Sequence, residues 1–415
     1  MERRNTLRTL SVVLFLYYGA IGSWNFCIVY LRELGFTSGE LGWMTAAGTG
    51  LGLIVLPFLG VLSDKASSPR RILLCCAAAL IPLKLLLPVT GALLGKAIVP
   101  FALLVAFNLT TVRAATTMSD AWTGDVVSRM GLPHGRVRSF GSIGHVCVSL
   151  LCSLLIGPVL PSWACAPFFA LLSAALFAVV LRAGRTVPDL PRTQGAAETA
   201  KASTGVSPLR LVLRNYYFLI YLLLVLGYCT FLGLVDLDLS YIMDAIGTPR
   251  SNIGLVGSWR AAVEVMVMAL LCRRPRRRTG TQLWLLLTLS GTLVGLEQLS
   301  YAALTGLGGM LAVTTLTGAA GGLYYGLNAN YVFEIVDRRA AGTAMSLAAV
   351  VHSLIGVVGA ALGGRIIERY GVLTLTTGAG LLILSLTALF ALLCALGRFV
   401  WKLPYAGEQT CTGPE

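Results

Sequence analysis

Residues 373–397 read LTLTTGAGLLILSLTALFALLCALG and contain no charged side chain. As an α-helix rising 1.5 Å per residue, such a stretch is about 37 Å long, enough to cross a hydrocarbon core of about 30 Å. Lipid offers no hydrogen-bond partners to a backbone, and a helix satisfies all of its peptide groups internally. The stretch therefore predicts a transmembrane helix.

Similar apolar blocks recur along the whole chain. The hydrophobic residues make up 56% of the 415 residues and the charged residues only 12%, about half the charged share of soluble domains. The blocks predict spans at 9–31, 41–62, 72–94, 97–119, 139–160 and 163–181, and six more at 215–236, 252–271, 282–303, 308–332, 342–363 and 373–397. We predict an all-α integral membrane protein with 12 transmembrane helices in two pseudo-symmetric six-helix bundles.

The polar segment between the two sets of spans divides the chain. Residues 184–213 are rich in Gly, Ala, Thr, Ser and Pro, a composition that does not pack and that is typical of linkers. We expect bundles at 1–183 and 214–400, with a tail at 401–415. The segments RSFG at 138–141 and RAAG at 339–342 fall at matching places in the two halves, which favours an internal duplication.

The net charge of +14 reports topology. With a cytoplasmic N-terminus, most of the 32 lysines and arginines fall in cytoplasmic segments, as the positive-inside rule requires. We therefore expect both termini in the cytoplasm and no nucleic-acid partner. The ten cysteines show no spacing typical of a disulfide or zinc framework, and no cofactor is expected.

The loop after the second span carries a recognisable pattern. It reads GVLSDK at 60–65 and is followed by two arginines at 70 and 71. This resembles the signature of the major facilitator superfamily, although Ser67 replaces the usual second glycine and the loop is longer. The resemblance implies that the glycine permits close helix contact and that the aspartate bridges to another element in one conformation. The gating or structural candidates in this chain are Gly60, Asp64, Lys65, Arg70, Arg71, Asp120, Arg138 and Gly141.

Further segments resemble one branch of that superfamily. They are RSFGSIG at 138–144, Glu264 in the eighth span, and the pairs GG at 363–364 and YG at 370–371. The branch includes lactose permease, nucleoside-proton symporters and phenylpropionate-type transporters. The resemblance implies that Glu264 couples transport to protons. The tenth span lacks the His and Glu pair of lactose permease, so sugar specificity is not implied.

Charged residues inside spans are expensive and usually face a partner or a watery cavity. Arg260 and Glu264 are four residues apart, on one helical face and close enough to pair; with Glu297 they are the proton-coupling candidates. Arg113 has three open roles: holding a substrate anion, bridging to Glu264, or pairing with Asp120 as a gate.

A cavity for a small organic solute is predicted from the polar and aromatic residues of the first, third, fourth and tenth spans. We expect the lone histidines at 145 and 352 to be hydrogen-bonded packing residues. Trp24 joins the aromatic residues that line the cavity or anchor the interface. The substrate-cavity candidates are Arg113, Lys84, Tyr17, Tyr18, Asn25, Tyr324, Tyr325 and Asn328.

These features favour a secondary transporter that works by alternating access, with proton-coupled symport ahead of proton-driven efflux by an antiporter of the same fold. A transport-inactive sensor and a membrane enzyme are weaker alternatives, since the sequence has no P-loop, His-Glu-x-x-His or Gly-x-Ser-x-Gly pattern. We expect a monomer in a bacterial inner membrane whose partners are lipid, a small-molecule substrate and protons.

Overall fold

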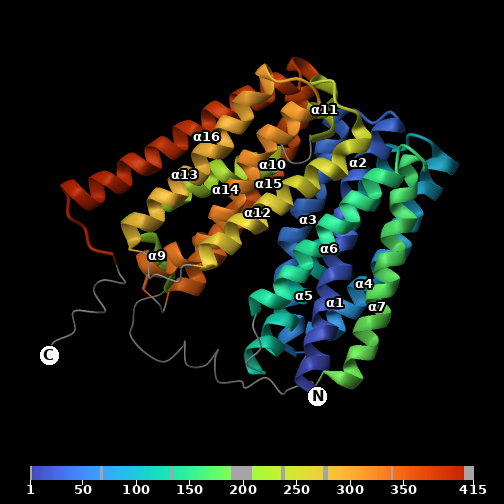
Figure 1. Cartoon of the computed structure of the whole chain (residues 1–415), viewed down its shortest axis with the longest axis horizontal. Helices are drawn as coiled ribbons and strands as arrows, with labels where there is room; N and C mark the ends of the chain where they lie inside the picture. Colours follow the sequence, from blue (N-terminus) through green and yellow to red (C-terminus); the bar gives the residue numbers. More distant parts are fainter. Residues whose placement is uncertain are drawn as a thin grey trace.

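The computed structural model describes residues 2–65, 69–130, 134–187, 208–234, 239–273, 279–337 and 340–405. The described residues are built from long helices (Figure 1). The first half of the chain contains α1 (Glu2–Gly22), α2 (Trp24–Glu33), α3 (Ser38–Lys65), α4 (Pro69–Leu94), α5 (Ile98–Arg129), α6 (His134–Leu155) and α7 (Cys165–Thr186). The second half contains α9 (Pro208–Leu213), α10 (Tyr216–Leu234), α11 (Leu239–Ala245), α12 (Ile253–Arg273), α13 (Gly280–Ser300), α14 (Gly306–Ile335), α15 (Ala341–Tyr370) and α16 (Val372–Ala395).

These helices confirm the predicted fold class. Within the described residues, 11 segments are helical, long and apolar enough to cross a membrane, and α10 supplies a further, shorter apolar helix. The first span is broken at Ser23 into α1 and α2, which the sequence pattern did not predict. Helices α5, α14 and α15 run past the predicted spans, because their polar ends continue the helix beyond the apolar stretch.

The same packing pattern occurs in both halves. In the first half, α1 packs on α6 and α7, α5 packs on α3 and α4, and α4 packs on α7. In the second half, α10 packs on α15 and α16, α14 packs on α12 and α13, and α13 packs on α16. Each of these main contacts of one half therefore has its counterpart in the other, which is the arrangement expected of two pseudo-symmetric bundles.

Two helix crossings join the halves: α3 with α15, and α6 with α12. At the first crossing, a Cβ on Gly364 would lie 2.2 Å from the backbone oxygen of Ser38, and the Ser38 hydroxyl donates to the Gly364 carbonyl at 2.9 Å. At the second crossing, a Cβ on Gly254 would lie 2.1 Å from the backbone oxygen of Ser149. Small residues thus let the backbones touch, as in other helix pairs packed in lipid.

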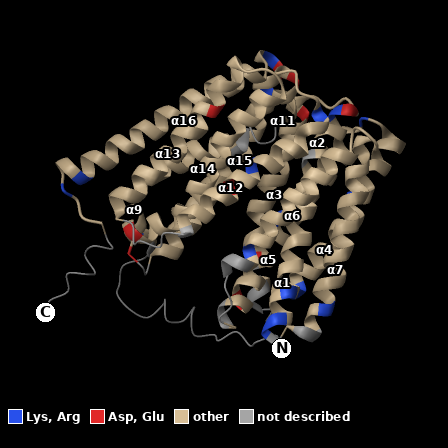
Figure 2. Ribbon diagram, viewed as in Figure 1, with Lys and Arg blue, Asp and Glu red and all other residues tan. Residues whose placement is uncertain are grey.

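Both close contacts lie toward the same end of the molecule, which carries α2 and α11 and which we call the far end. From there the two halves diverge toward the end where the N-terminus lies (Figure 1). Figure 2 shows the described charged residues concentrated at these two ends, with long uncharged stretches of helix between them. This distribution is the one expected of helices that cross a bilayer.

An ion cluster that we call the far-end latch (Arg32, Asp244 and Arg250) also joins the halves. Arg32 on α2 donates from Nη2 to Oδ2 of Asp244 on α11 at 2.5 Å, and Arg250 donates from Nε and Nη2 to the same carboxylate at 2.8 Å. The Arg32 guanidinium also lies 3.6 Å from the ring centre of Tyr241. The latch therefore closes the far end with charge as well as with backbone contact.

The described residues include both ends of the predicted linker and the start of the predicted tail. Much of the linker, 188–207, lies outside the described residues, as does 406–415. The residues just before the latter fold back on the second half: the Tyr217 hydroxyl donates to the Leu403 carbonyl at 2.8 Å, and Tyr405 is fully buried with its ring 4.6 Å from that of Tyr217. The start of the predicted tail is therefore part of the folded bundle.

Replacing Gly364 with Ala should destabilise this structure, because the added methyl group meets the Ser38 backbone. Overpacking of this kind costs about 1–3 kcal/mol, which a lower melting temperature of the purified protein would report. Gly378 is a matched control, since it lies in α16 with open space around it, and its change to Ala should be neutral or slightly stabilising. Equal melting temperatures for the two variants would contradict the crossing.

Changing Asp244 to Asn should loosen the far end. Each partly exposed ion pair contributes up to about 1 kcal/mol, so we expect a roughly two- to fivefold gain in the population with the far end open. Spin labels at Val99 and Ala302, both exposed at the far ends of the two halves, would report it as a longer distance. Glu40→Gln is the control, because Glu40 pairs with Lys96 at 2.8 Å within the first half; an equal response there would reject the latch.

The latch should not respond to pH in the physiological range. Burial raises the pKa of Asp244, but hydrogen bonds from Arg250 and Arg32 more than reverse this, and the pKa lies below its usual value. A carboxyl group whose pKa is lower in the closed form stabilises that form fully above a pH of about 3.9. The stabilisation is lost as the pH falls through the lowered pKa. The same label pair should therefore give one distance from pH 8 to pH 5, and any opening within that interval would refute the assignment.

Candidate functional site

A central cavity of about 560 Å³ lies between the two halves. Its walls come from α1, α2, α3, α5 and α6 on one side and from α10, α11, α12, α14 and α15 on the other. Because helices of both halves contribute, any rocking of the halves changes the shape of the cavity. The polar, charged and aromatic residues that line the cavity include Tyr18, Trp24, Thr49, Arg113, Arg138, Ser142, His145, Cys229, Arg260, Glu264, Tyr325 and His352.

Positive charge predominates in this wall. Among the described lining residues, Arg113 and Arg138 come from the first half, and Arg260 and Glu264 come from the second. A guanidinium presents several N–H donors in a planar fork that suits oxygen-rich partners. The cavity is therefore suited to a polar solute that offers acceptor oxygens or ring nitrogens.

Arg113 is held against the neighbouring helix of its own half. Its Nη2 donates to the Thr49 hydroxyl at 3.2 Å, and its Cδ is 3.6 Å from the place where a Cβ on Gly52 would lie. Asp120, which the sequence offered as one partner for Arg113, instead accepts from the Tyr18 hydroxyl at 3.1 and 3.2 Å. Tyr18, and not Arg113, therefore holds Asp120 in this structure, while contact of Arg113 with a solute and a bridge from Arg113 to Glu264 both stay predictions.

Tyr18 links the cavity to its edge on the side of the N-terminus. The Arg138 guanidinium lies over the Tyr18 ring at 4.3 Å, and a Cβ on Gly141 would be 2.9 Å from that ring. A smaller cavity of about 160 Å³, lined by Asp120 and Arg138 among others, adjoins this cluster. The residues predicted as gates at 120, 138 and 141 thus meet around one tyrosine.

Arg260 and Glu264 follow one another on the cavity face of α12. The Arg260 guanidinium lies 5.5 Å from the ring centre of Phe231 on α10. The Glu264 carboxylate faces α14 at a glycine: a Cβ on Gly321 would be 2.9 Å from Oε2. A carboxylate that is both at the cavity wall and against a helix of the same half can respond to what occupies the cavity.

Sequence reasoning assigned the cavity histidines to packing. His145 and His352 both line the cavity, and His352 Nδ1 lies 3.1 Å from the Cys229 Sγ of α10. These residues are isolated in the sequence, and only the approach of α10 to α15 brings the pair together. No motif at a fixed spacing could have revealed it.

Several predicted cavity residues lie elsewhere, which corrects those expectations. Tyr17 is buried and bonds the Val112 carbonyl at 2.7 Å, and Tyr324 is buried with its ring stacked 4.0 Å from that of Tyr228. The Asn328 side chain accepts a hydrogen bond from Tyr221. In each case a neighbouring helix supplies the partner, so the side chain packs within its own half.

Two charged candidates are also buried away from the cavity. Glu297 is buried within the second half and accepts hydrogen bonds from Tyr301 at 2.7 Å and from Gln298 at 3.2 Å. Lys84 is fully buried, with its Nζ 3.2 Å from the ring centre of Trp24. The expectation that Lys84 faces the cavity is therefore wrong.

The remaining candidates lie at the end where the N-terminus is, or outside the described residues. Arg70 donates to the Val180 carbonyl at 3.3 Å, and Arg71 is exposed. The side chains at 25, 64 and 65, and the surroundings of Gly60, fall outside the described residues. Within the described part of the chain, no group of three or more His, Cys, Asp or Glu residues is placed to hold a metal ion.

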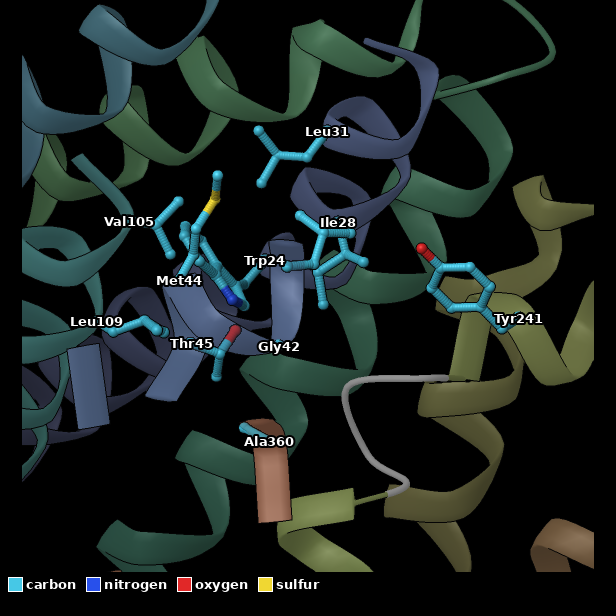
Figure 3. Close-up of a pocket in the computed structure, with 11 residues that line it drawn as sticks. Trp24, Ile28, Leu31, Gly42, Met44, Thr45, Val105, Leu109, Tyr241 and Ala360 are labelled. Atoms are coloured by element: carbon cyan, nitrogen blue, oxygen red, sulfur yellow. The ribbon is translucent and has the colours of Figure 1, made fainter. Parts of the chain in front are cut away.

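A narrow apolar pocket of about 30 Å³ lies on the far-end side of the central cavity (Figure 3). Trp24 and Thr45 line both spaces. Tyr241 and Ala360 of the second half complete the pocket, and Tyr241 also lies under Arg32 of the latch. The cavity is thus separated from the far end by apolar packing first and by the latch beyond it.

Comparisons with known proteins agree with this architecture. The model of the MFS_1 like family matches residues 7–376. YegT of Escherichia coli (strain K12), whose name provisionally assigns it to nucleoside transport, is 29% identical over 253 residues; the match covers 57% of this chain and 54%, about half, of YegT.

Solved structures show the same fold over nearly the whole chain. The nucleoside transporter NupG superposes with a TM-score of 0.73 and 15% identity, covering 94% of this chain and 99% of NupG. A bacterial homologue of the human lysosomal transporter Spinster, in an inward-facing and unoccupied conformation, gives a TM-score of 0.64 and 14% identity, covering 95% and 96% of the two chains. The chain therefore belongs to the MFS_1 like family and has the major facilitator fold.

Proposed function

We propose that this protein carries nucleosides across a bacterial inner membrane by alternating access, in symport with protons. The observation that carries the proposal is the polar cavity between two similar bundles, which in the described part of the chain are joined toward the far end and diverge from it. Rocking of the halves about the α3–α15 and α6–α12 crossings would close the side of the N-terminus and open the far end. With both termini in the cytoplasm, the structure is the inward-facing state, and the molecule works as a monomer.

The cavity suits a nucleoside in size and in chemistry. Its volume of about 560 Å³ lies within the usual range for small-molecule sites, roughly 300–1,000 Å³. Arginine and histidine side chains supply donors and acceptors for a sugar and a base, while Trp24, Tyr18 and Tyr325 supply aromatic surface for the base. The names of YegT and NupG point to the same class of solute.

Glu264 is the proposed proton carrier. It lines the cavity, whereas Glu297 is enclosed within the second half. Water or solute in the cavity changes the solvation of Glu264 directly, and solvation controls the proton affinity of a carboxylate. Rocking of the halves changes the water and the charges around Glu264, so that this carboxyl group binds a proton in one arrangement of the halves and releases it in the other.

Binding tests the substrate class. Uridine or adenosine should raise the melting temperature of the purified protein, because a ligand bound only by the folded state stabilises it. Free ribose should not. Arg113→Gln should raise the dissociation constant for uridine about tenfold, because charge-assisted hydrogen bonds are lost. Arg71→Gln, at an exposed position away from the cavity, should leave it unchanged. Stabilisation by no nucleoside would refute the proposed class of substrate.

Transport in liposomes tests the coupling. Glu264→Gln keeps the shape of the side chain but cannot carry a proton, so gradient-driven uridine accumulation should fall at least about tenfold while uridine exchange continues. Glu297→Gln, the matched control, should accumulate uridine normally. The reverse result would move the proton site to Glu297.

The direction of proton movement separates symport from the antiport alternative. Uridine is added outside liposomes that have no imposed pH gradient. Inward uridine flow through a symporter carries protons inward, so a pH dye trapped inside should report acidification. An antiporter would give alkalinisation, and that outcome would overturn the proposed symport.

A further inference from the structure

Lys84 occupies an unusual place for a charged side chain. It is fully buried at the middle of α4, and among the described residues its Nζ has no hydrogen-bond partner. Two aromatic rings enclose it instead: Nζ lies 3.2 Å from the ring centre of Trp24 on α2 and 4.0 Å from that of Phe169 on α7. A cation is attracted to the face of an aromatic ring, most strongly where water is excluded.

Trp24 is the member of this group that reaches the cavity. It begins α2 directly after the break at Ser23, whose hydroxyl donates to the Ala20 carbonyl at 2.8 Å. Its indole lines both the central cavity and the narrow pocket, where it lies beside Ile28 and Thr45 (Figure 3). The order from the cavity inward is therefore Trp24, Lys84 and Phe169.

This order assigns different surroundings to the two sides of the indole. The Lys84 ammonium covers one face of the Trp24 ring. The part of the ring that Lys84 leaves uncovered lines the cavity. Trp24 begins a helix directly after a break and packs against the hydrophobic core, and the cation behind the ring adds a directional restraint to that packing. A restrained ring costs less conformational entropy when a flat solute stacks on it.

We infer that Lys84 is a positioning residue, which holds Trp24 so that its cavity side stacks on the base of a bound nucleoside. This inference rests on the proposed function for its substrate and extends it, since it names the part of the solute that Trp24 contacts. Stacking of a base on an aromatic side chain is tolerant of base identity. We therefore expect Trp24 to recognise the presence of a base, and the polar residues of the cavity to discriminate among bases.

A double-mutant cycle tests the inference. Lys84→Met has a similar length and no charge, and it should weaken uridine and adenosine binding about tenfold. In a Trp24→Leu background, which itself binds these nucleosides weakly, the same change should add no more than about twofold. Lys96→Met is the control for loss of a lysine near an aromatic ring, since Lys96 lies 5.7 Å from the Phe36 ring at the far end, and it should leave binding unchanged. An equal loss from Lys84→Met in both backgrounds would overturn the inference.

A second measurement needs no substrate and so separates this inference from the proposed function. The emission of Trp24 is obtained by subtracting the tryptophan fluorescence of the Trp24→Phe variant from that of the protein with Trp24. Its quenching by acrylamide should rise at least about twofold in Lys84→Met, because the ring is no longer restrained. Unchanged quenching would overturn the positioning role even if nucleosides bind, and increased quenching would support it even if none does.

Two further outcomes are informative. If Lys84→Met fails to fold, Phe169→Leu removes the other wall of the ammonium site and should raise the quenching of Trp24 in the same direction. If Lys84 instead contacts an anionic solute directly, Lys84→Met should weaken the binding of uridine monophosphate and spare uridine, and that pattern would refute the inference.

Discussion

Backbone contact between the halves at the far end is the interaction on which the rest of the structure depends. Lipid provides no hydrophobic force that presses one apolar helix against another, so close packing must supply the attraction. The approaches at Gly364 and Gly254 place helix backbones in direct contact on both sides of the molecule. With the halves joined at that end and diverging from it, a water-accessible space forms between them, and polar residues can occupy mid-membrane positions.

That space explains why the chain tolerates so many intramembrane charges. Each charged residue at the centre of a membrane helix costs at least about 2.5–3.5 kcal/mol when it faces lipid. Arg113, Arg138, Arg260 and Glu264 avoid this by facing the cavity. Glu297 and Lys84 use other solutions: hydrogen bonds from neutral donors in the first case and aromatic faces in the second. The cavity and the bundle interior thus stabilise charge by different means.

The fold could be predicted from the sequence because it depends on length and composition. Apolar blocks long enough to span a membrane recur in two sets. In lipid, a block of this length satisfies its backbone hydrogen bonds by forming a helix. The break at Ser23 was missed because apolar residues continue before Gly22 and after Asn25, so the block as a whole is long and apolar enough for one unbroken span. The resemblance to the major facilitator superfamily added the branch but no partner for any side chain.

The site could be predicted only where one helix carries the information. Arg260 and Glu264 share a face because they are four residues apart, and both line the cavity. Tyr17 and Tyr18, or Tyr324 and Tyr325, are neighbours that project about 100° apart on a helix, and in each pair only the second reaches the cavity. In a membrane helix all sides are apolar, so the pattern does not show which side faces inward. The prediction for Lys84 failed for a related reason: the two aromatic rings that contact it, Trp24 and Phe169, come from other helices, α2 and α7.

The ordered start of the tail changes how the C-terminus should be regarded. Residues 401–405 follow the last membrane helix and read as a disposable extension, yet Tyr405 inserts against Gly280 at the start of α13, where a Cβ would be 2.5 Å from its ring. Through Tyr217 the same residues reach the start of α10. Residues 401–405 therefore tie three helices of the second half together and act as a clasp. The folded part of the second half therefore extends at least to Tyr405 and does not stop where the last helix leaves the membrane.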